Sequence, residues 1–171
     1  MSAENIKQMI RVDQAGEYGA ARIYAGQLAV IGDRHPASRA IRHMAAQEQR
    51  HLDTFNLLIS EQRVRPTLLQ PIWHVAGFAL GAVTAAIGPE AAMACTAAIE
   101  TEIDRHYRQQ IESLGDSSPA LSATIAEFRD EELEHKATAL AQGAERAPAY
   151  PVMSAAIRLG CRAAIALSNR L

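Results

Sequence analysis

The chain has 171 residues, which is most naturally one domain and is long enough to bury a substantial core. Its net charge of -2 gives no strong positive field, so nucleic acid is excluded as an expected partner. Alanine is abundant, aromatic residues make up only 5% of the chain, and runs of β-branched residues are scarce; this composition favours packed helices over a sheet.

The cysteines and the N-terminus bear on the cellular compartment. Cys95 and Cys161 lie far apart in apolar helical stretches and form no C-x-x-C pair, which suits a reducing compartment. The first residues, Met-Ser-Ala-Glu-Asn, resemble neither a secretory signal nor an Arg- and Ser-rich transit peptide. We therefore expect a bacterial protein or a trimmed eukaryotic one.

The first predicted helix spans about residues 4–31, where apolar side chains recur at helical spacing. Glu17 lies in its middle, flanked by Gly16 and Gly19, each of which weakens a helix by roughly 1 kcal/mol relative to Ala. These glycines are either a tolerated defect or a point of close helix approach beside a ligand. Tyr24 lies seven residues after Glu17, on the same face.

The second predicted helix spans about residues 37–62 and carries Glu48 and His51 three residues apart. At that spacing the two side chains are about 60° apart around the helix axis, so both can reach one metal ion. They share a face with Met44 and Phe55, which directs them toward the core. Because burying an unpaired carboxylate costs several kcal/mol, a positive partner such as a metal is expected there.

An extra apolar helix is predicted for residues 67–87, of which residues 72–87 are uncharged. Sixteen helical residues cover about 24 Å, short of the roughly 30 Å hydrocarbon core of a bilayer. Either the segment is a buried helix that covers one end of a bundle, or it lies on a membrane surface with Arg63, Arg65 and Trp73 near the headgroups. We favour the second interpretation.

The third bundle helix is predicted for about residues 90–114. Glu100 and Tyr107 share one face and repeat the Glu–Tyr spacing of the first helix. Glu102 points elsewhere and is expected to be solvated, and His106 is more than about 100° away from the Glu100 face.

The fourth bundle helix is predicted for about residues 120–143 and repeats the Glu-x-x-His spacing at Glu132 and His135. The charged run around them would alone indicate a solvated face, but helical phase places these two side chains on the apolar side. Glu131 lies four residues before His135 and ranks second to Glu132 as a ligand.

A last helix is predicted for about residues 151–171, rich in Ala, Ile and Leu, with Arg158 and Arg162 one turn apart. It is either a helix packed against the bundle or a second membrane-surface element with a basic edge.

The same half-set of metal ligands therefore occurs twice, as Glu followed by Glu-x-x-His: Glu17, Glu48, His51, Glu100, Glu132 and His135. This is the ligand set of a carboxylate-bridged di-iron or di-manganese bundle. We predict an all-α, ferritin-like four-helix bundle in one domain, 1–171, with an extra apolar helix between the second and third bundle helices and a C-terminal helix.

The predicted ligands divide between two metals. Glu17 and His51 would hold one metal, Glu100 and His135 the other, and Glu48 and Glu132 would be shared. Oxygen and nitrogen donors without a thiol suit first-row divalent metals, and zinc is less expected because a reaction on O₂ needs a redox metal. The spacing alone does not choose between storing iron, destroying peroxide and hydroxylating a substrate.

Several motifs resemble those of the demethoxyubiquinone hydroxylases of ubiquinone biosynthesis, and the resemblance covers nearly the whole chain. They are Arg11–Ala20, Arg22–Gln27, Arg63–Thr67, Gly77–Gly81, Ala94–Thr96, Phe128–His135 and Ala147–Tyr150. The resemblance implies that the six ligands fall on the positions named above. It also implies that His106 and Tyr107 form a His–Tyr pair beside the metals with a role in electron transfer.

The activity implied by the resemblance is that of a membrane-bound di-iron monooxygenase. It would use O₂ to hydroxylate the ring of a 2-polyprenyl-3-methyl-6-methoxy-1,4-benzoquinol, with NADH as the electron source. The protein would be peripheral, on the cytoplasmic face of a bacterial inner membrane, or on the matrix side of the mitochondrial inner membrane if the chain is trimmed. A lipid-binding partner from the biosynthetic complex is implied as well, and a homo-oligomer is compatible with these expectations.

Three alternatives make different demands on the chain. A rubrerythrin-like peroxidase would need a soluble surface and often carries a cysteine-ligated electron-transfer site, which the sequence lacks. An iron-storage subunit would lack the apolar stretch between the second and third bundle helices. A purely structural bundle would leave six inward-facing ligands without a purpose.

Overall fold

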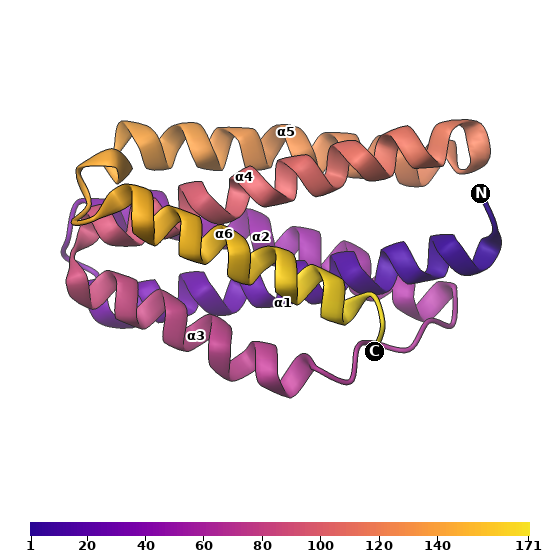
Figure 1. The fold of residues 1–171 in the computed structure, drawn as a ribbon, viewed down its shortest axis with the longest axis horizontal. Coiled ribbons are helices and arrows are strands. Elements are labelled where there is room, and N and C mark those ends of the chain that lie inside the picture. Colours follow the sequence, from indigo (N-terminus) through magenta and orange to yellow (C-terminus); the bar gives the residue numbers. More distant parts are fainter.

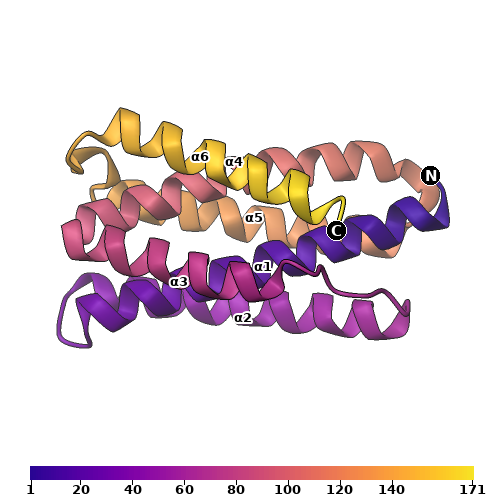
Figure 2. The same ribbon diagram turned by 60° about the horizontal axis from the view of Figure 1, so that its bottom comes forward.

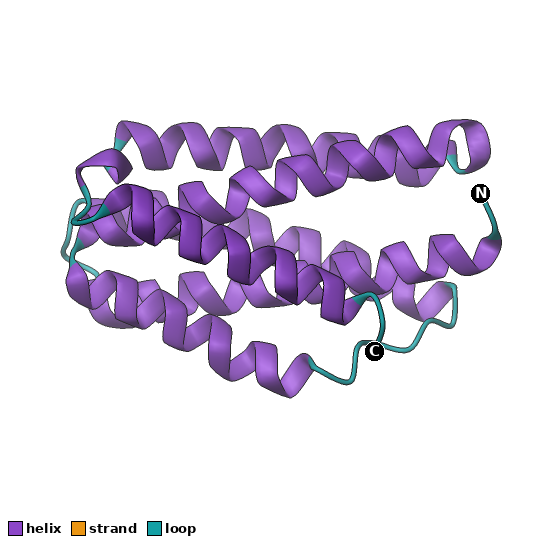
Figure 3. Cartoon of the chain, viewed as in Figure 1, coloured by secondary structure: helices purple, strands orange, loops and turns teal.

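Helices account for nearly all of residues 1–171, which the computed structural model describes in full (Figures 1 and 3). The structure contains no strand, so the predicted all-α class is confirmed. The α-helices are α1 (Ala3–Ile31), α2 (Ala37–Glu61), α3 (Gln70–Ile87), α4 (Pro89–Leu114), α5 (Pro119–Ala141) and α6 (Tyr150–Ser168). Two short 3-10 helices, Gly115–Ser117 and Ala144–Arg146, lie beside α5.

Helix α3 begins at Gln70 rather than at residue 67, because residues 64–69 form a loop and turn. Its N-terminal turn carries a proline, which suits a first turn whose amide groups have no partner within the helix. Helix α6 ends at Ser168 rather than at residue 171.

The bundle is formed by α1, α2, α4 and α5, with α1 packed on α2 and α4 packed on α5. Helices α3 and α6 lie outside it, α3 along α1 and α6 along α4, as the two views show (Figures 1 and 2). Helix α3 therefore does not cover an end of the bundle. It lies lengthwise on one side.

The first half of α4 is surrounded by other helices. Residues 91–98 are all buried, and they are small or apolar throughout. A helix that is apolar on every face must be buried on every face, and α3 and α6 supply the outer cover that a four-helix bundle alone would not. The ferritin-like bundle is thus extended by two helices on the same side.

Backbone contact fixes α3 on α1. A Cβ atom added at Gly81 would overlap the carbonyl of Ile23, and one added at Gly26 would overlap the carbonyl of Phe78. Only glycine allows the two backbones to approach this closely. At these points α3 and α1 therefore meet backbone to backbone, with glycine at each contact.

The outward sides of α3 and α6 expose large apolar side chains. They include Ile72, Val75, Val83 and Ile87 on α3 and Val152, Leu159 and Leu167 on α6, with exposed fractions between 45% and 72%. Both helices are long and apolar enough to cross a membrane by length and composition alone, and most of each lies unburied in the structure.

The expectation that Glu102 is solvated is wrong, because only 2% of this residue is exposed. Its Oε1 accepts a hydrogen bond from Arg158 Nε at 2.6 Å, and its Oε2 lies 3.9 Å from Arg162 Nε. The phase of α4 alone could not reveal that α6 covers this face. The two arginines of α6 turn toward the bundle, so α6 is a packed helix whose basic groups pair with a buried carboxylate.

Candidate metal centre

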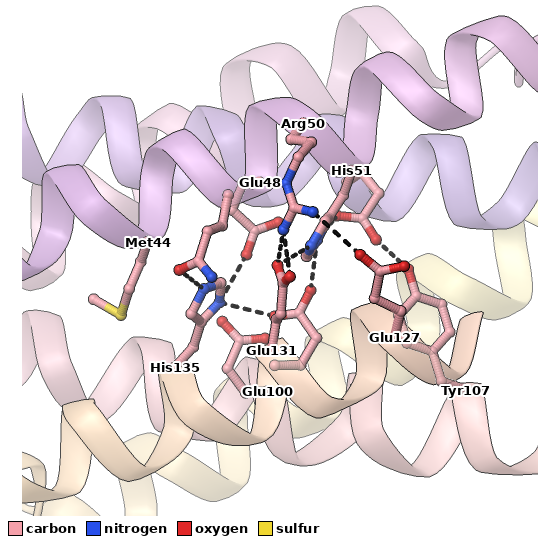
Figure 4. Close-up of polar contacts among 12 residues, drawn as sticks. Met44, Glu48, Arg50, His51, Glu100, Tyr107, Glu127, Glu131 and His135 are labelled. Carbon is pink, nitrogen blue, oxygen red and sulfur yellow. Dashed lines mark hydrogen bonds and ion pairs between the residues drawn. The ribbon is translucent and has the colours of Figure 1, made fainter. Parts of the chain in front are cut away.

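Four bundle helices bring six titratable side chains together in the interior. They are Glu17 from α1, Glu48 and His51 from α2, Glu100 from α4, and Glu132 and His135 from α5, each at most 2% exposed. Figure 4 shows the neighbourhood of this cluster, with the carboxylates and imidazoles directed toward one another. These are the six residues that the repeated spacing singled out.

The ligand atoms fall into two overlapping groups. One group contains Glu17, Glu48, His51 and Glu132, whose ligand atoms all lie within 4.8 Å of one another. A second group, with the same limit, contains Glu48, Glu132, Glu100 and His135. Two glutamates belong to both groups, which is the division expected for a pair of metals with shared carboxylates.

Both imidazoles present the same nitrogen to the cluster. His51 Nδ1 lies 3.1 Å from Glu132 Oε1 and 3.5 Å from Glu17 Oε2. His135 Nδ1 lies 3.0 Å from Glu132 Oε2 and 3.2 Å from Glu48 Oε1. The i, i+3 spacing on α2 and on α5 places each imidazole one turn from a shared glutamate, so the two halves are built on the same pattern.

The donor set fits a pair of divalent metals. Glu17 Oε2, Glu100 Oε2 and both carboxylate oxygens of Glu48 are buried without any hydrogen-bond partner. No lysine or arginine donates to the four carboxylates of the cluster. Leaving such atoms unpaired costs several kcal/mol, and two divalent cations would compensate for it. Carboxylate and imidazole donors are those that iron and manganese accept in helical bundles.

Burial and mutual repulsion set the protonation of the cluster. Burial and then the charge of Glu132 raise the pKa values of Glu48 and Glu100 well above 4.5, and burial also raises the pKa of Glu132. Burial alone would lower the pKa of His51, but hydrogen bonds with Glu132 and Glu17 raise it to about 10. Burial lowers the pKa of His135, as does the neighbouring His51. The metal-free cluster therefore holds protons at neutral pH.

Two tyrosines support the outer glutamates, and each crosses to the opposite half. Tyr24 donates its hydroxyl to Glu100 Oε1 at 3.0 Å, and Tyr107 donates to Glu17 Oε1. Burial, and then the charge of the glutamate that each contacts, raises the pKa of both tyrosines well above 10, so both stay neutral donors. The sequence placed each tyrosine on a face with one glutamate, but it did not indicate this exchange between helices.

His106 lies outside the cluster and is linked to a residue that the sequence analysis missed. Its Nε2 is 3.1 Å from Oδ1 of Asp13, a side chain that is 2% exposed. Gln110 also donates to Asp13, at 2.7 Å. Asp13 precedes Glu17 by one helical turn, which was the available signal.

Glu131 contacts the cluster from outside it. Its Oε2 lies 2.8 Å from Nε2 of His51, the nitrogen that faces away from the glutamates, and it also binds Arg50. Partial burial raises the pKa of Glu131, but hydrogen bonds from Arg50 and His51 outweigh this and lower it. The structure thus brings Glu132, and not Glu131, into the two ligand groups.

A cavity of about 550 Å³ lies between α1, α3, α4 and α6. Its walls are mainly apolar, and Asp13, Glu17, His106 and Tyr107 form a polar part of its lining. Trp73, expected near lipid headgroups, lines the cavity and donates its indole N–H to Ser168 Oγ at 3.0 Å.

Gly16 and Gly19 lie on the wall of this cavity. A Cβ atom added to either would meet nothing within 4 Å, so no neighbouring atom requires a glycine at these two positions, although α3 approaches α1 closely where Gly77 lies against the carbonyl of Gly19. Their missing side chains leave space beside Glu17.

Comparisons with known proteins find the same family of relatives over nearly the whole chain. Residues 4–168 match the family described as ubiquinone biosynthesis protein COQ7. The chain is 57% identical over 166 residues to a 3-demethoxyubiquinol 3-hydroxylase of Rhodospirillum rubrum, covering 97% of this chain and 78% of that protein. It is 52% identical over 175 residues to a human protein named NADPH-dependent 3-demethoxyubiquinone 3-hydroxylase, mitochondrial, covering 100% and 80%. A Saccharomyces cerevisiae protein named 5-demethoxyubiquinone hydroxylase, mitochondrial, is 44% identical over 182 residues, covering 97% and 78%.

The raised pKa values make metal binding pH-dependent. At pH 7 the metal-free cluster holds a proton on His51, whose pKa is about 10, and the raised pKa of Glu48 favours its protonated form, whereas a metal binds only the deprotonated groups. We expect Co²⁺ to displace at least one proton and its apparent affinity to rise about tenfold per pH unit for each proton displaced. Calorimetric titrations at pH 6, 7 and 8, in buffers of different ionisation enthalpy, measure both quantities. Affinity that does not change with pH, with no proton release, would contradict the protonation described here.

Proposed function

The chain belongs to the family of the ubiquinone biosynthesis protein COQ7, and from this premise we infer that it is an enzyme that hydroxylates the ring of a ubiquinone precursor. The observation that carries the inference is the family match across residues 4–168, together with a buried Glu/His cluster of the kind that holds two metals. The finer description of the substrate, a 2-polyprenyl-3-methyl-6-methoxy-1,4-benzoquinol, is part of the proposal, as is O₂ as co-substrate.

We propose that the cluster holds two iron ions. Glu17 and His51 would bind one, Glu100 and His135 the other, and Glu48 and Glu132 both; the two ligand groups support this division. When bound, iron supplies the redox chemistry that lets O₂ donate one oxygen atom to the ring, which zinc cannot do.

The surrounding protein residues hold the proposed ligands in place and keep water away. The neutral hydroxyls of Tyr24 and Tyr107 each fix one oxygen of an outer glutamate, which leaves the second oxygen free to face a metal. Such supporting hydrogen bonds orient ligands and tune the metals they bind.

The cavity is the proposed substrate site. The quinol ring would lie at the polar part of the lining, where His106 is held by Asp13 and its imidazole can exchange a hydrogen bond with a ring hydroxyl. The polyprenyl tail would follow the apolar walls between α3 and α6. Tyr107 borders the cavity and also contacts Glu17, which supports a role for the His106–Tyr107 pair in passing electrons from a bound quinol toward the metals.

The electron source is proposed to be a reduced nicotinamide. The resemblance in the sequence implies NADH, whereas the name of the human relative specifies NADPH. Rates of product formation with NADH and with NADPH would distinguish the two.

We also propose that the exposed sides of α3 and α6 bind a membrane surface. Both carry large apolar side chains outward, and the cavity lies behind them, so a substrate with a lipid-soluble tail could pass directly from the bilayer. The human and Saccharomyces cerevisiae relatives bear names that place them in mitochondria. The membrane would be the one that holds the quinone pool, with the protein on its cytoplasmic or matrix side.

The ligand proposal predicts the effect of replacing one shared glutamate. Glu132→Ala should abolish both iron loading, expected at two per chain, and O₂-dependent product from a short-chain quinol analogue with NADPH or NADH. Glu134→Ala is the matched control, because Glu134 is an exposed glutamate on the same helix and should keep both. Full activity of Glu132→Ala would refute the assignment, and iron uptake without hydroxylated product in the wild type would favour storage.

The substrate-site proposal predicts a steric effect in α6. Ala164 lines the cavity, whereas its neighbour Ala163 is exposed and does not. Ala164→Leu should raise the KM for the quinol analogue about tenfold at unchanged iron content, because the added carbons occupy the space of the ligand. Ala163→Leu should leave KM unchanged. Equal kinetics in the two variants would argue against this cavity.

The membrane proposal predicts flotation with liposomes. The double variant Val83→Ser/Leu159→Ser removes apolar groups from α3 and α6. It should lower the membrane-bound fraction about tenfold. The control, Val30→Ser/Leu57→Ser, removes similar exposed groups from α1 and α2 and should float like the wild type. A wild-type protein that stays in the soluble fraction would contradict the proposal.

A further inference from the structure

The approximate symmetry of the metal cluster extends to the far side of each imidazole. His51 Nε2 lies 2.8 Å from Glu131 Oε2, and His135 Nε2 lies 3.1 Å from Gln47 Oε1. Gln47 directly precedes Glu48, and Glu131 directly precedes Glu132. In each half, the residue before the shared glutamate reaches across to the histidine of the other helix.

Gln47 and Glu131 differ chemically, whereas the two tyrosines of the cluster are equivalent. Tyr24 and Tyr107 make the same contact in the two halves, with one hydroxyl on one carboxylate. Behind the histidines, however, one acceptor is a carboxylate and the other is a neutral amide. The two proposed metal positions therefore have the same ligands but different support.

The position of Glu131 is fixed by its surroundings. Arg50 binds both oxygens of its carboxylate, and the same arginine reaches Glu127 Oε1 at 3.3 Å. Glu127 is exposed, with 64% of its side chain accessible, and touches neither histidine. Arg50 thus holds Glu131 against His51 from the outside (Figure 4).

The group that accepts the hydrogen bond from Nε2 changes how strongly the opposite nitrogen, Nδ1, binds a metal. When a metal is bound at Nδ1, the hydrogen of each imidazole lies on the outer Nε2 and is donated to Glu131 or Gln47. A carboxylate acceptor draws more strongly on this N–H than an amide oxygen does, and it makes the opposite nitrogen more electron-rich. Loss of such a supporting partner typically lowers metal affinity by about 10–100-fold.

We propose that Glu131 makes the Glu17–His51 position the tighter of the two metal positions, so that it fills first and empties last. The Glu100–His135 position, which is supported by Gln47, is the weaker one. This inference rests on the proposed metal centre and adds an order of binding to it. The tighter position is also the one that borders the cavity, because Glu17 lines that cavity and Glu100 does not.

The order of binding can be measured on the whole chain without turnover. Metal-free protein is titrated anaerobically with Co²⁺ by calorimetry, and crystals grown with one equivalent of Co²⁺ are examined by anomalous diffraction. We expect two binding events whose affinities differ by about 10–100-fold, with the first cobalt at Glu17 and His51.

Exchanging the two acceptors provides the decisive variant. In Gln47→Glu/Glu131→Gln the first cobalt should lie at Glu100 and His135, and in Glu131→Gln alone the two affinities should converge. Glu127→Gln is the matched control: it removes the other carboxylate bound to Arg50 and should leave the order unchanged. General destabilisation would weaken both positions and would not reverse their order.

Each outcome is decisive. Two equal affinities in the wild type, or an exchanged variant that still fills the Glu17–His51 position first, would overturn the role of Glu131. Failure of the wild type to bind any cobalt would instead overturn the proposed metal centre itself.

Discussion

Four carboxylates buried together in a helical bundle are the constraint on which the rest of this structure depends. Glu17, Glu48, Glu100 and Glu132 have almost no access to water and receive no hydrogen bond from lysine or arginine. In a protein interior such a cluster is stable only if protons or metal ions neutralise it. The supporting contacts follow from this need: two tyrosines hold the outer glutamates, and the outer nitrogens of the histidines are held by groups that keep the inner nitrogens directed at the carboxylates.

Much of the fold and the central cluster could be predicted from the sequence, because both depend on helical spacing. A Glu and a His three residues apart must share a face, and two such pairs with matching upstream glutamates can converge in a bundle. Contacts between helices could not be predicted in this way. Glu102 is buried because α6 covers it, and Asp13 matters because α4 brings His106 to it. Such contacts depend on how the helices pack together, which the helical phase of one segment does not predict.

Helices α3 and α6 have inner and outer sides with different roles in the structure. Their inner sides complete the apolar cover of α4 and enclose a cavity that Glu17 lines, while their outer sides expose large apolar residues. A soluble bundle with the same ligands would need neither feature. The proposed chemistry and the proposed membrane contact are therefore linked by position, because the cavity lies between the metal cluster and the exposed apolar surface.

The glycine contacts between α1 and α3 also determine how the cavity can open. Backbone lies against backbone at Gly26 and Gly81, so α1 and α3 cannot move apart without losing this close packing. On the other side, α3 and α6 meet at few points: Trp73 donates a hydrogen bond to Ser168, and the amide of Leu68, just before α3, donates to the carbonyl of Leu171, just after α6. A long apolar molecule would therefore enter between α3 and α6, which share few contacts, because that route leaves the packing of α1 on α3 and the metal cluster undisturbed.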